Sequence, residues 1–367
     1  MKLLMLLAVV GCAFHPPAEP PRLSVAEGPL RRVDGDGESL LAVRAGSAYD
    51  PPGREGLAQV AATMLEAHGA RVLEVGPELA LFEVDPARAA DLAQWLGAPS
   101  LDGAALAAVV EPLIERSPSC EEVAEAALDR WQFSGHPYRG PVAGRRSTLA
   151  TLSPAEVIAF LRARYTRDGM ALRGPEIPAL NQLSSRISPR VTPAALAPAG
   201  LDGAATLVVR APAGYDCGAV ASDQEPEDLQ IWSWAQRAWA AEQPMVDGLI
   251  QGQRLDFRVQ RPLRWVGDRE RIRERSEKGW DASAWQAAQI GELSAAPLGH
   301  LLFGQPPIRP HSPVAYSPAW NQQLRDWFVD GPHRVVVVTG DVTEYLDGEG
   351  HPRPGVLTVA TFEDLFQ

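Results

Sequence analysis

The chain has 367 residues, of which 46% are hydrophobic and 22% charged, so it is long enough to bury a sizeable core and to form two domains. Its formal net charge is −12 at pH 7, which argues against nucleic-acid binding, because phosphate recognition requires a basic surface. The same charge argues against binding to other polyanions.

The first residues have the pattern of an export signal. Lys2 precedes a run of eight apolar residues, which is too short to span a bilayer as a mature helix and fits a signal peptide over 1–11. Residues 9–12 resemble a bacterial lipobox, where cleavage precedes a lipid-modified cysteine, and ordinary signal cleavage is the alternative. We therefore expect Cys12 to carry acyl chains and the Pro-rich residues 12–27 to act as a tether. The expected location is the bacterial cell envelope, with the lipid in the outer membrane and the protein facing the periplasm.

Alternating strand and helix patterns predict an α/β chain in two series. The first series has predicted strands at 39–46 and 78–84 and predicted helices at 53–69, 86–97, 102–116 and 153–165. The last of these helices has a capping box, with Ser153 at the N-cap and Glu156 three residues later. After a linker at 174–203, the second series has predicted strands at 205–212, 254–260 and 333–342 and predicted helices at 227–243 and 281–303. We therefore expect two related domains, 28–173 and 204–367.

The helix predicted at 53–69 carries the functional interpretation. Its apolar residues recur at helical spacing and share one buried face: Leu57, Val60, Ala61, Met64, Leu65 and His68. Its other face carries Gln59, Ala62 and Thr63.

Two blocks of the sequence resemble the insulinase or pitrilysin-like zinc peptidases. The first block matches that family in a Gly-Ser turn and in the helix that follows, at Ala45, Gly46, Ser47, Tyr49, Asp50, Gly56, Leu57, Ala58, Met64 and Leu65. The second block, 134–172, is similar to the family's His-Pro-Tyr loop, Pro-Val-x-Gly turn and capped helix. The resemblance implies two related α/β domains of the insulinase and mitochondrial-processing-peptidase-like fold, each a mostly antiparallel sheet covered by helices.

The catalytic motif of that family is degenerate in this sequence. In active members, the two histidines of His-x-x-Glu-His bind zinc and the glutamate is the general base. Gln59, Ala62 and Thr63 stand at these positions and offer two weak neutral ligands and a methyl group. Glu111 is the candidate for the family's third ligand, and one carboxylate does not hold zinc. In the second domain, Phe257 stands where the family has a tyrosine that holds peptide, so we expect no catalytic residue, no metal ligand and no cofactor.

Besides Cys12, the sequence contains Cys120 and Cys217. In an exported protein they can form a disulfide that joins the two halves. The alternative is two buried free thiols, which is slightly preferred because the sequence gives no distance between them.

We therefore expect a pseudo-peptidase lipoprotein that is a non-catalytic subunit of an active insulinase-like zinc peptidase and completes its chamber. A stand-alone peptide-binding or scaffold lipoprotein is the first alternative. An active metallopeptidase with an unrecognised metal site is the second. Only the N-terminal lipid is expected to contact the membrane.

Overall fold

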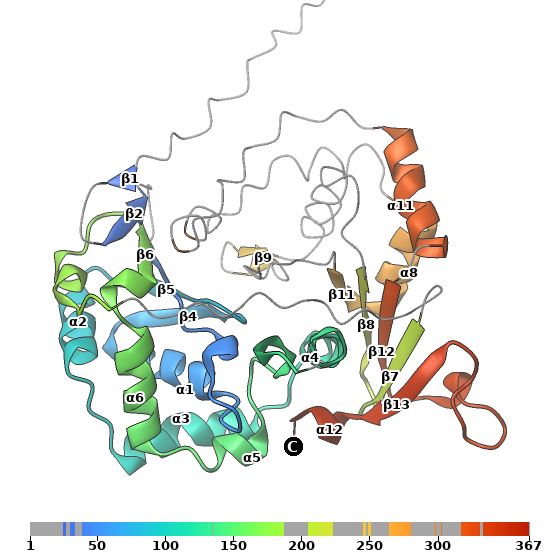
Figure 1. Ribbon diagram of the computed structural model, residues 1–367, viewed down its shortest axis with the longest axis horizontal. Helices are drawn as coiled ribbons and strands as arrows, with labels where there is room; N and C mark the ends of the chain where they lie inside the picture. Colours follow the sequence, from blue (N-terminus) through green and yellow to red (C-terminus); the bar gives the residue numbers. More distant parts are fainter. Residues whose placement is uncertain are drawn as a thin grey trace, which may run out of the picture.

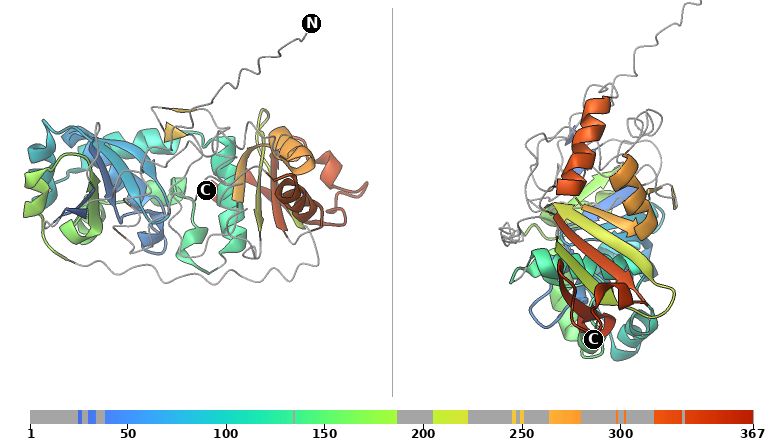
Figure 2. Two further views of the ribbon diagram at one scale, coloured as in Figure 1. Left: turned by 90° about the horizontal axis from the view of Figure 1, so that it is seen from above. Right: turned by 90° about the vertical axis from the view of Figure 1, so that its right-hand side faces the viewer.

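The structure is a computed structural model that describes residues 25–26, 30–33, 39–133, 135–186, 205–222, 245–246, 249–250, 264–279, 298, 302, 317–330 and 333–366. Within them the chain builds two main sheets, one from each half of the sequence, with helices around and between them (Figures 1 and 2).

The first sheet has six strands in the order β1-β2-β6-β3-β5-β4, and every pair except β2–β6 is antiparallel. Its strands are β1 (Val25–Ala26), β2 (Arg31–Val33), β3 (Ser39–Val43), β4 (Ala70–Val75), β5 (Ala80–Val84) and β6 (Met170–Arg173). All five residues of β3 are buried, as expected for a short apolar run that is covered on both faces.

One face of the first sheet packs against helices to form the main core of this half. Leu41 and Val43 of β3 belong to this core, together with residues of α1, α2, α3 and α6. The helices of this half are α1 (Leu57–Met64), α2 (Ala89–Gly97), α3 (Gly103–Glu115), α4 (Cys120–Gln132), α5 (Arg146–Leu149) and α6 (Pro154–Arg164). Short 3-10 helices are η1 (Ser47–Tyr49), η2 (Leu65–His68), η3 (Pro137–Arg139), η4 (Arg167–Gly169) and η5 (Pro178–Gln182).

The second sheet has five strands in the order β11-β8-β12-β7-β13. β7 is parallel to both of its neighbours and β8 is antiparallel to both of its own, so this sheet is evenly mixed. Its strands are β7 (Ala205–Arg210), β8 (Asp216–Ser222), β11 (Arg264–Asp268), β12 (His333–Thr339) and β13 (Val356–Thr361). The other elements of this half are β9 (Met245–Val246), β10 (Leu249–Ile250), α8 (Arg269–Lys278), α11 (Pro318–Asp330), η6 (Thr343–Tyr345) and α12 (Phe362–Phe366).

Each half of the sequence covers the sheet of the other half. α4 belongs to the first half, but its buried apolar residues pack on the second sheet, so that α4 lies between the two sheets in both figures. In the opposite direction, the helical residues Leu298 and Leu302 are fully buried against the second face of the first sheet, beside Leu40 and Ala42. The two halves are therefore interlocked through their hydrophobic cores.

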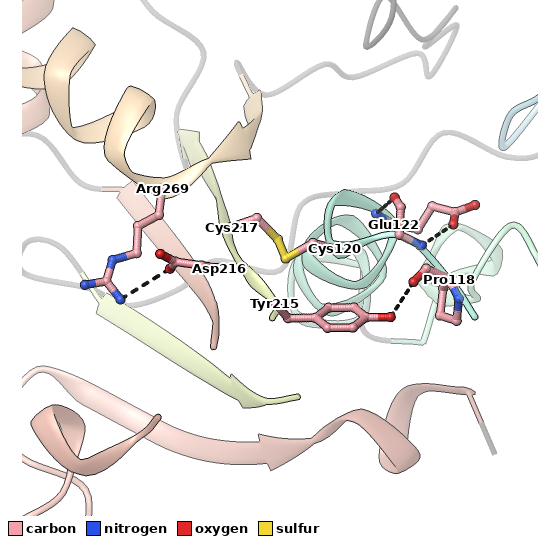
Figure 3. Close-up of a disulfide and its surroundings, with 8 residues drawn as sticks. Pro118, Cys120, Glu122, Tyr215, Asp216, Cys217 and Arg269 are labelled. Atoms are coloured by element: carbon pink, nitrogen blue, oxygen red, sulfur yellow. Dashed lines mark hydrogen bonds and ion pairs between the residues drawn. A yellow bond between two sulfur atoms is a disulfide. The ribbon is translucent and has the colours of Figure 1, made fainter. Parts of the chain in front are cut away.

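A disulfide joins α4 to the second sheet. Cys120, the first residue of α4, is bonded to Cys217 on β8, with the two Cα atoms 5.9 Å apart (Figure 3). Beside it, the Tyr215 hydroxyl donates a hydrogen bond to the Pro118 carbonyl at 2.7 Å. The slight preference for free thiols is therefore corrected, because α4 crosses to the second sheet and brings the two cysteines together.

The predicted elements of the first half are present, with shorter bounds. The capping box at Ser153 is confirmed, because its hydroxyl accepts the Glu156 N–H and the Glu156 carboxylate accepts the Ser153 N–H. The folded part of the first half continues past residue 173, since Ile177 and Leu180 are buried in the main core.

Several predictions fall on residues that the structure does not describe. These are the export signal and Cys12, the helix at 227–243, the strand at 254–260 with Phe257, and all of the helix at 281–303 except two residues. Among the described helices, none combines the length and apolar character that a membrane crossing requires.

Candidate functional site

Helix α1 is held at its N-terminal end by the turn that precedes it. The carboxylate of Asp50 accepts hydrogen bonds from the N–H groups of Gly56 at 2.8 Å and Ala58 at 2.7 Å. Gly56 has φ = +99°, in the left-handed region that favours glycine, and turns the chain into the helix. These contacts fix where the positions of the degenerate motif lie.

Gln59 and Thr63 face one cavity, whereas Ala62, expected on the same face, is buried in the main core, and none of the three side chains can perform the family's chemistry. The Thr63 hydroxyl donates to the Gln59 carbonyl oxygen at 2.9 Å, and the Gln59 side-chain amide donates to the same hydroxyl at 3.5 Å. The hydroxyl is therefore engaged within the helix, as is common for threonine at this spacing. Ala62 is fully buried and has no group that accepts a proton.

Gln59 and Thr63 line a cavity of about 410 Å³, with walls from α1, β4, α4, residues 140–143 and α12. Five carboxylates line it: Glu66, Glu74, Glu122, Glu125 and Asp129. Arg116 is the only cation among the described lining residues, and its guanidinium donates to both oxygens of Glu122, each at 2.9 Å. The lining therefore combines this ion pair with four further carboxylates and with apolar side chains such as Val72, Leu113 and Val142.

Helix α4 supplies the carboxylates nearest in sequence to the disulfide. Its apolar face, which includes Val123 and Leu128, packs on the second sheet, and its other face directs Glu125 and Asp129 to the cavity. Both carboxylate residues are buried, with 6% and 2% exposure. α4 is absent from the predicted elements, although Ser119 and Glu122 form a capping box with the same spacing as the one identified at α6.

The position of Glu111 differs from the expectation. Glu111 lies on α3, is exposed and is not part of the cavity lining, whereas α4 faces the motif positions across the cavity. Within the described residues, no group of three His, Cys, Asp or Glu side chains could hold a metal ion. Gln59 and Thr63 themselves supply only an amide and a hydroxyl, which are weak neutral ligands, so the motif positions do not fit zinc.

A contact between two glycines places residues 140–143 over α1. A Cβ atom at Gly144 would lie 2.5 Å from the Gly56 Cα, and Gly144 has φ = +81°. The Thr148 hydroxyl secures the same segment by donating to the Glu55 carbonyl at 2.6 Å. The cavity wall thus depends on an approach of two backbones that a side chain would prevent.

We expect Gly144→Ala to lower the free energy of unfolding by about 2–6 kcal/mol, because left-handed strain and overpacking each cost about 1–3 kcal/mol. Gly53→Ala is the matched control, since Gly53 has φ = +74° but no atom within 4 Å of an added Cβ. Denaturant unfolding of both variants measures the difference. Equal losses in the two variants would contradict the role of the close contact.

The buried turn makes the stability of the fold depend on pH. Burial raises the pKa of Asp50 to about 8 and outweighs the N–H groups of Gly56 and Ala58, which lower it. The folded chain therefore keeps a proton that the unfolded chain releases above its ordinary pKa of 3.8. Because the pKa of Asp50 is raised, the stability that this proton contributes is fully present below the ordinary pKa of 3.8 and is lost as the pH rises through about 8.

We expect this one group to lower the free energy of unfolding by up to about 1.4 kcal/mol per pH unit between roughly pH 5 and 8. Asp50→Asn removes the titration, so the variant's stability should lack this slope, although it loses one N–H acceptor at every pH. Urea unfolding of both proteins at several pH values measures the slopes. Parallel pH profiles would show that Asp50 does not titrate in this range.

Comparisons with known proteins give a fold. No model of a protein family matches the sequence, and no curated protein matches it. A solved structure described as a peptidase M16 inactive domain from Pseudomonas fluorescens superposes with a TM-score of 0.58 and 13% identity, covering 87% of this chain and 97% of that one. A protease from Helicobacter pylori gives a TM-score of 0.57 and 11% identity, covering 86% of this chain and 98% of that one.

A third solved structure is longer than this chain. The periplasmic protease PqqL from Escherichia coli superposes with a TM-score of 0.52 and 10% identity over 88% of this chain, which spans 48% of PqqL. The described elements, two α/β units with mixed sheets and covering helices, agree with these structures. The chain therefore has the fold of the insulinase-like M16 peptidases.

Proposed function

We propose that this protein is a non-catalytic, insulinase-like pseudo-peptidase of the bacterial cell envelope, and a partner subunit that completes the chamber of an active zinc peptidase. The observation that carries the proposal is the state of α1, where Gln59 and Thr63 bond to each other and Ala62 is buried. Peptide hydrolysis by this architecture needs a metal-bound water and a proton acceptor. The motif positions supply neither.

Comparison with a solved structure supports the non-catalytic part of the proposal. The Pseudomonas fluorescens structure, which has the same fold, is itself described as an inactive domain. A domain that retains the fold and a polar cavity but lacks the catalytic groups can still bind a partner and shape the access of substrate.

The disulfide supports export. Disulfides persist in oxidising compartments such as the periplasm and are rare in the cytosol. The bond between Cys120 and Cys217 joins the interlocked halves, so folding in an oxidising compartment suits this chain. It agrees with a signal peptide over 1–11 and with lipidation of Cys12.

We expect the wild-type chain to incorporate an alkyne analogue of palmitate when it is expressed in a bacterial host. Cys12→Ser should incorporate none, because the acceptor thiol is lost. Fluorescent detection of the coupled label measures the difference, and Cys120→Ser is the matched control for loss of a cysteine elsewhere. Equal labelling of wild type and Cys12→Ser would contradict lipidation at this position.

The proposed function is tested by capture of the tagged full chain from detergent-solubilised membranes of its host. Recovery of a homologue with an intact His-x-x-Glu-His motif, in a stable stoichiometry, supports the subunit proposal. Recovery of no related protein in repeated experiments contradicts it. Zinc analysis and a peptide-cleavage assay on the chain alone test the metallopeptidase alternative, which requires stoichiometric metal and activity.

The cavity favours one other function. It has a volume of about 410 Å³ and a lining of carboxylates and apolar side chains, which could hold a peptide without a partner subunit. Fluorescence anisotropy of a labelled random peptide library with the purified chain tests this stand-alone function. Binding by the isolated chain, together with failure to capture a homologue, would favour a peptide-binding lipoprotein over a subunit.

A further inference from the structure

Strand β13 forms an open edge of the second sheet. It is last in the strand order and pairs with β7, and no other strand of the described residues lies along its second edge. Leu357 is 51% exposed and is the only exposed large hydrophobic side chain in the part of the chain that the structure describes. Thr358 and Thr361 are exposed as well. An edge of this kind offers backbone N–H and C=O groups to a further strand.

The other edges of the two main sheets have features that usually prevent such pairing. In the first sheet, β4 contains Arg71 and Glu74, and β1 has only two residues. In the second sheet, β11 ends at Asp268. Charged side chains and short strands oppose the addition of a strand at an edge. In contrast, β13 has six residues without a charge or a proline, although the formal net charge of the chain is −12.

The exposure of Leu357 results from an irregularity in β13. The register with β7 shifts between Val356 and Thr358, so Leu357 has no partner residue on β7. Val359 and Ala360 have partners on β7 but are only partly buried. Apolar surface therefore remains at this edge, and a second strand would remove part of it from water.

The charges at the two ends of β13 indicate which strand fits. Arg353 precedes the strand and Glu363 follows it, and both side chains are exposed. In an antiparallel pair of identical strands, the start of each strand lies beside the end of the other, so Arg353 of each copy approaches Glu363 of the other. A parallel pair would bring like charges together, which is unfavourable. The end charges are thus self-complementary in the antiparallel orientation.

We propose that β13 is a self-association surface, at which two copies of this chain pair their β13 strands antiparallel across a two-fold axis. The register that sets Arg353 opposite Glu363 places Thr358 on the axis, opposite Thr358 of the other copy. It also places Leu357 opposite Val359, so that each exposed leucine is covered by the other copy. The pairing joins the two five-stranded sheets into one. This inference does not rest on the proposed function, because it concerns contacts between identical chains.

Disulfide trapping tests the orientation and the register. In the full chain with Cys12→Ser, the native Cys120 and Cys217 are bonded to each other, so Thr358→Cys supplies the only free thiol. Opposite residues of an antiparallel pair have Cα atoms about 4.5–5.5 Å apart, a distance that a disulfide spans. Mild oxidation should convert Thr358→Cys to a covalent dimer at least about tenfold faster than Thr361→Cys, because the two copies of residue 361 lie about 20 Å apart in this register.

Sedimentation velocity measures the association without a covalent bond. A strand pair is a small interface, so the dimer is expected at high micromolar concentrations of the full chain. Leu357→Lys should raise the Kd at least about tenfold, because each copy loses an apolar contact and gains a charge at the edge. Gln322→Lys is the matched control, since Gln322 is exposed on α11 and the change of charge is the same, and it should leave the Kd unchanged.

A charge exchange tests the contact between the strand ends. Arg353→Glu alone should raise the Kd, because it places two acidic side chains together, and Arg353→Glu with Glu363→Arg should restore it. Failure of the double variant to restore the Kd overturns the antiparallel pairing. Circular dichroism checks that each variant is folded.

Equal rates of cross-linking for Thr358→Cys and Thr361→Cys overturn the proposal, because collisions rather than a fixed register would then bring the thiols together. A dimer whose Kd is unchanged by Leu357→Lys overturns it, and so does a chain that stays monomeric and forms no covalent dimer. None of these results bears on the capture experiment, which tests the subunit function through recovery of a homologue. The two proposals can therefore fail separately.

Discussion

Replacing both Cys120 and Cys217 by alanine is expected to lower the free energy of unfolding by about 3–5 kcal/mol. The two residues are 97 positions apart in the sequence, so the disulfide closes a long loop and strongly restricts the unfolded chain. In the folded chain the bond also holds the start of α4 against β8. The loss is therefore expected to affect the cavity wall as well as global stability.

Denaturant unfolding of the double variant and of the oxidised and reduced wild type measures this loss. The reduced wild type should resemble the double variant, which controls for the altered side chains. Cys12→Ser is the control for removing a cysteine outside the loop. A loss below about 1 kcal/mol would show that the contacts of α4 and of residues 298 and 302 hold the halves together without the covalent bond.

The first half could be predicted well because its signals are local. The capping box at Ser153 marks the start of α6, and the apolar periodicity from Leu57 to Met64 marks α1. The continuous apolar run of β3 correctly indicates a strand. These signals depend on neighbouring residues, so they do not require knowledge of which element packs on which.

α4 could not be recognised from periodicity alone. Its sequence is rich in carboxylates, and its apolar face is made largely of alanine, with Val123, Leu128 and the partly buried Trp131 as its large residues. The available signal was the capping box of Ser119 and Glu122. The resemblance instead matches the family's third ligand to Glu111, which is exposed on α3.

The contacts between the halves lie beyond what a single sequence can show. An apolar stripe predicts that a helix is buried, but not that Leu298 and Leu302 cover the first sheet while α4 covers the second. The pairing of Cys120 with Cys217 has the same origin, since it follows from the crossing of α4. The cavity forms because elements cross between the halves: α4, which packs on the second sheet, and α12 complete walls that the rest of the first half leaves open.

Restoring two imidazoles should give this chain a metal site. We expect the double variant Gln59→His and Thr63→His to bind Zn²⁺ stoichiometrically, because the two side chains are four residues apart on α1 and line the cavity with Glu125 and Asp129. The wild type should bind none at this position, since its donors are an amide and a hydroxyl. Competition with a fluorescent chelator measures the affinity, and an excess of zinc of about 100 times Kd should add about 2.7 kcal/mol of stability.

The contribution of α4 can be separated from that of the histidine pair. Ala104→His with Ala108→His places an equally spaced pair on α3, where both positions are exposed and neither lines the cavity. We expect the α1 pair to bind zinc at least about tenfold more tightly, a difference of about 1.4 kcal/mol, because a carboxylate of α4 can act as a third ligand. Adding Asp129→Asn or Glu125→Gln to the α1 pair should remove most of this advantage. Equal affinities of the α1 and α3 pairs would mean that the α4 carboxylates do not reach the motif positions, and that the cavity has lost the geometry of a metal site as well as its ligands.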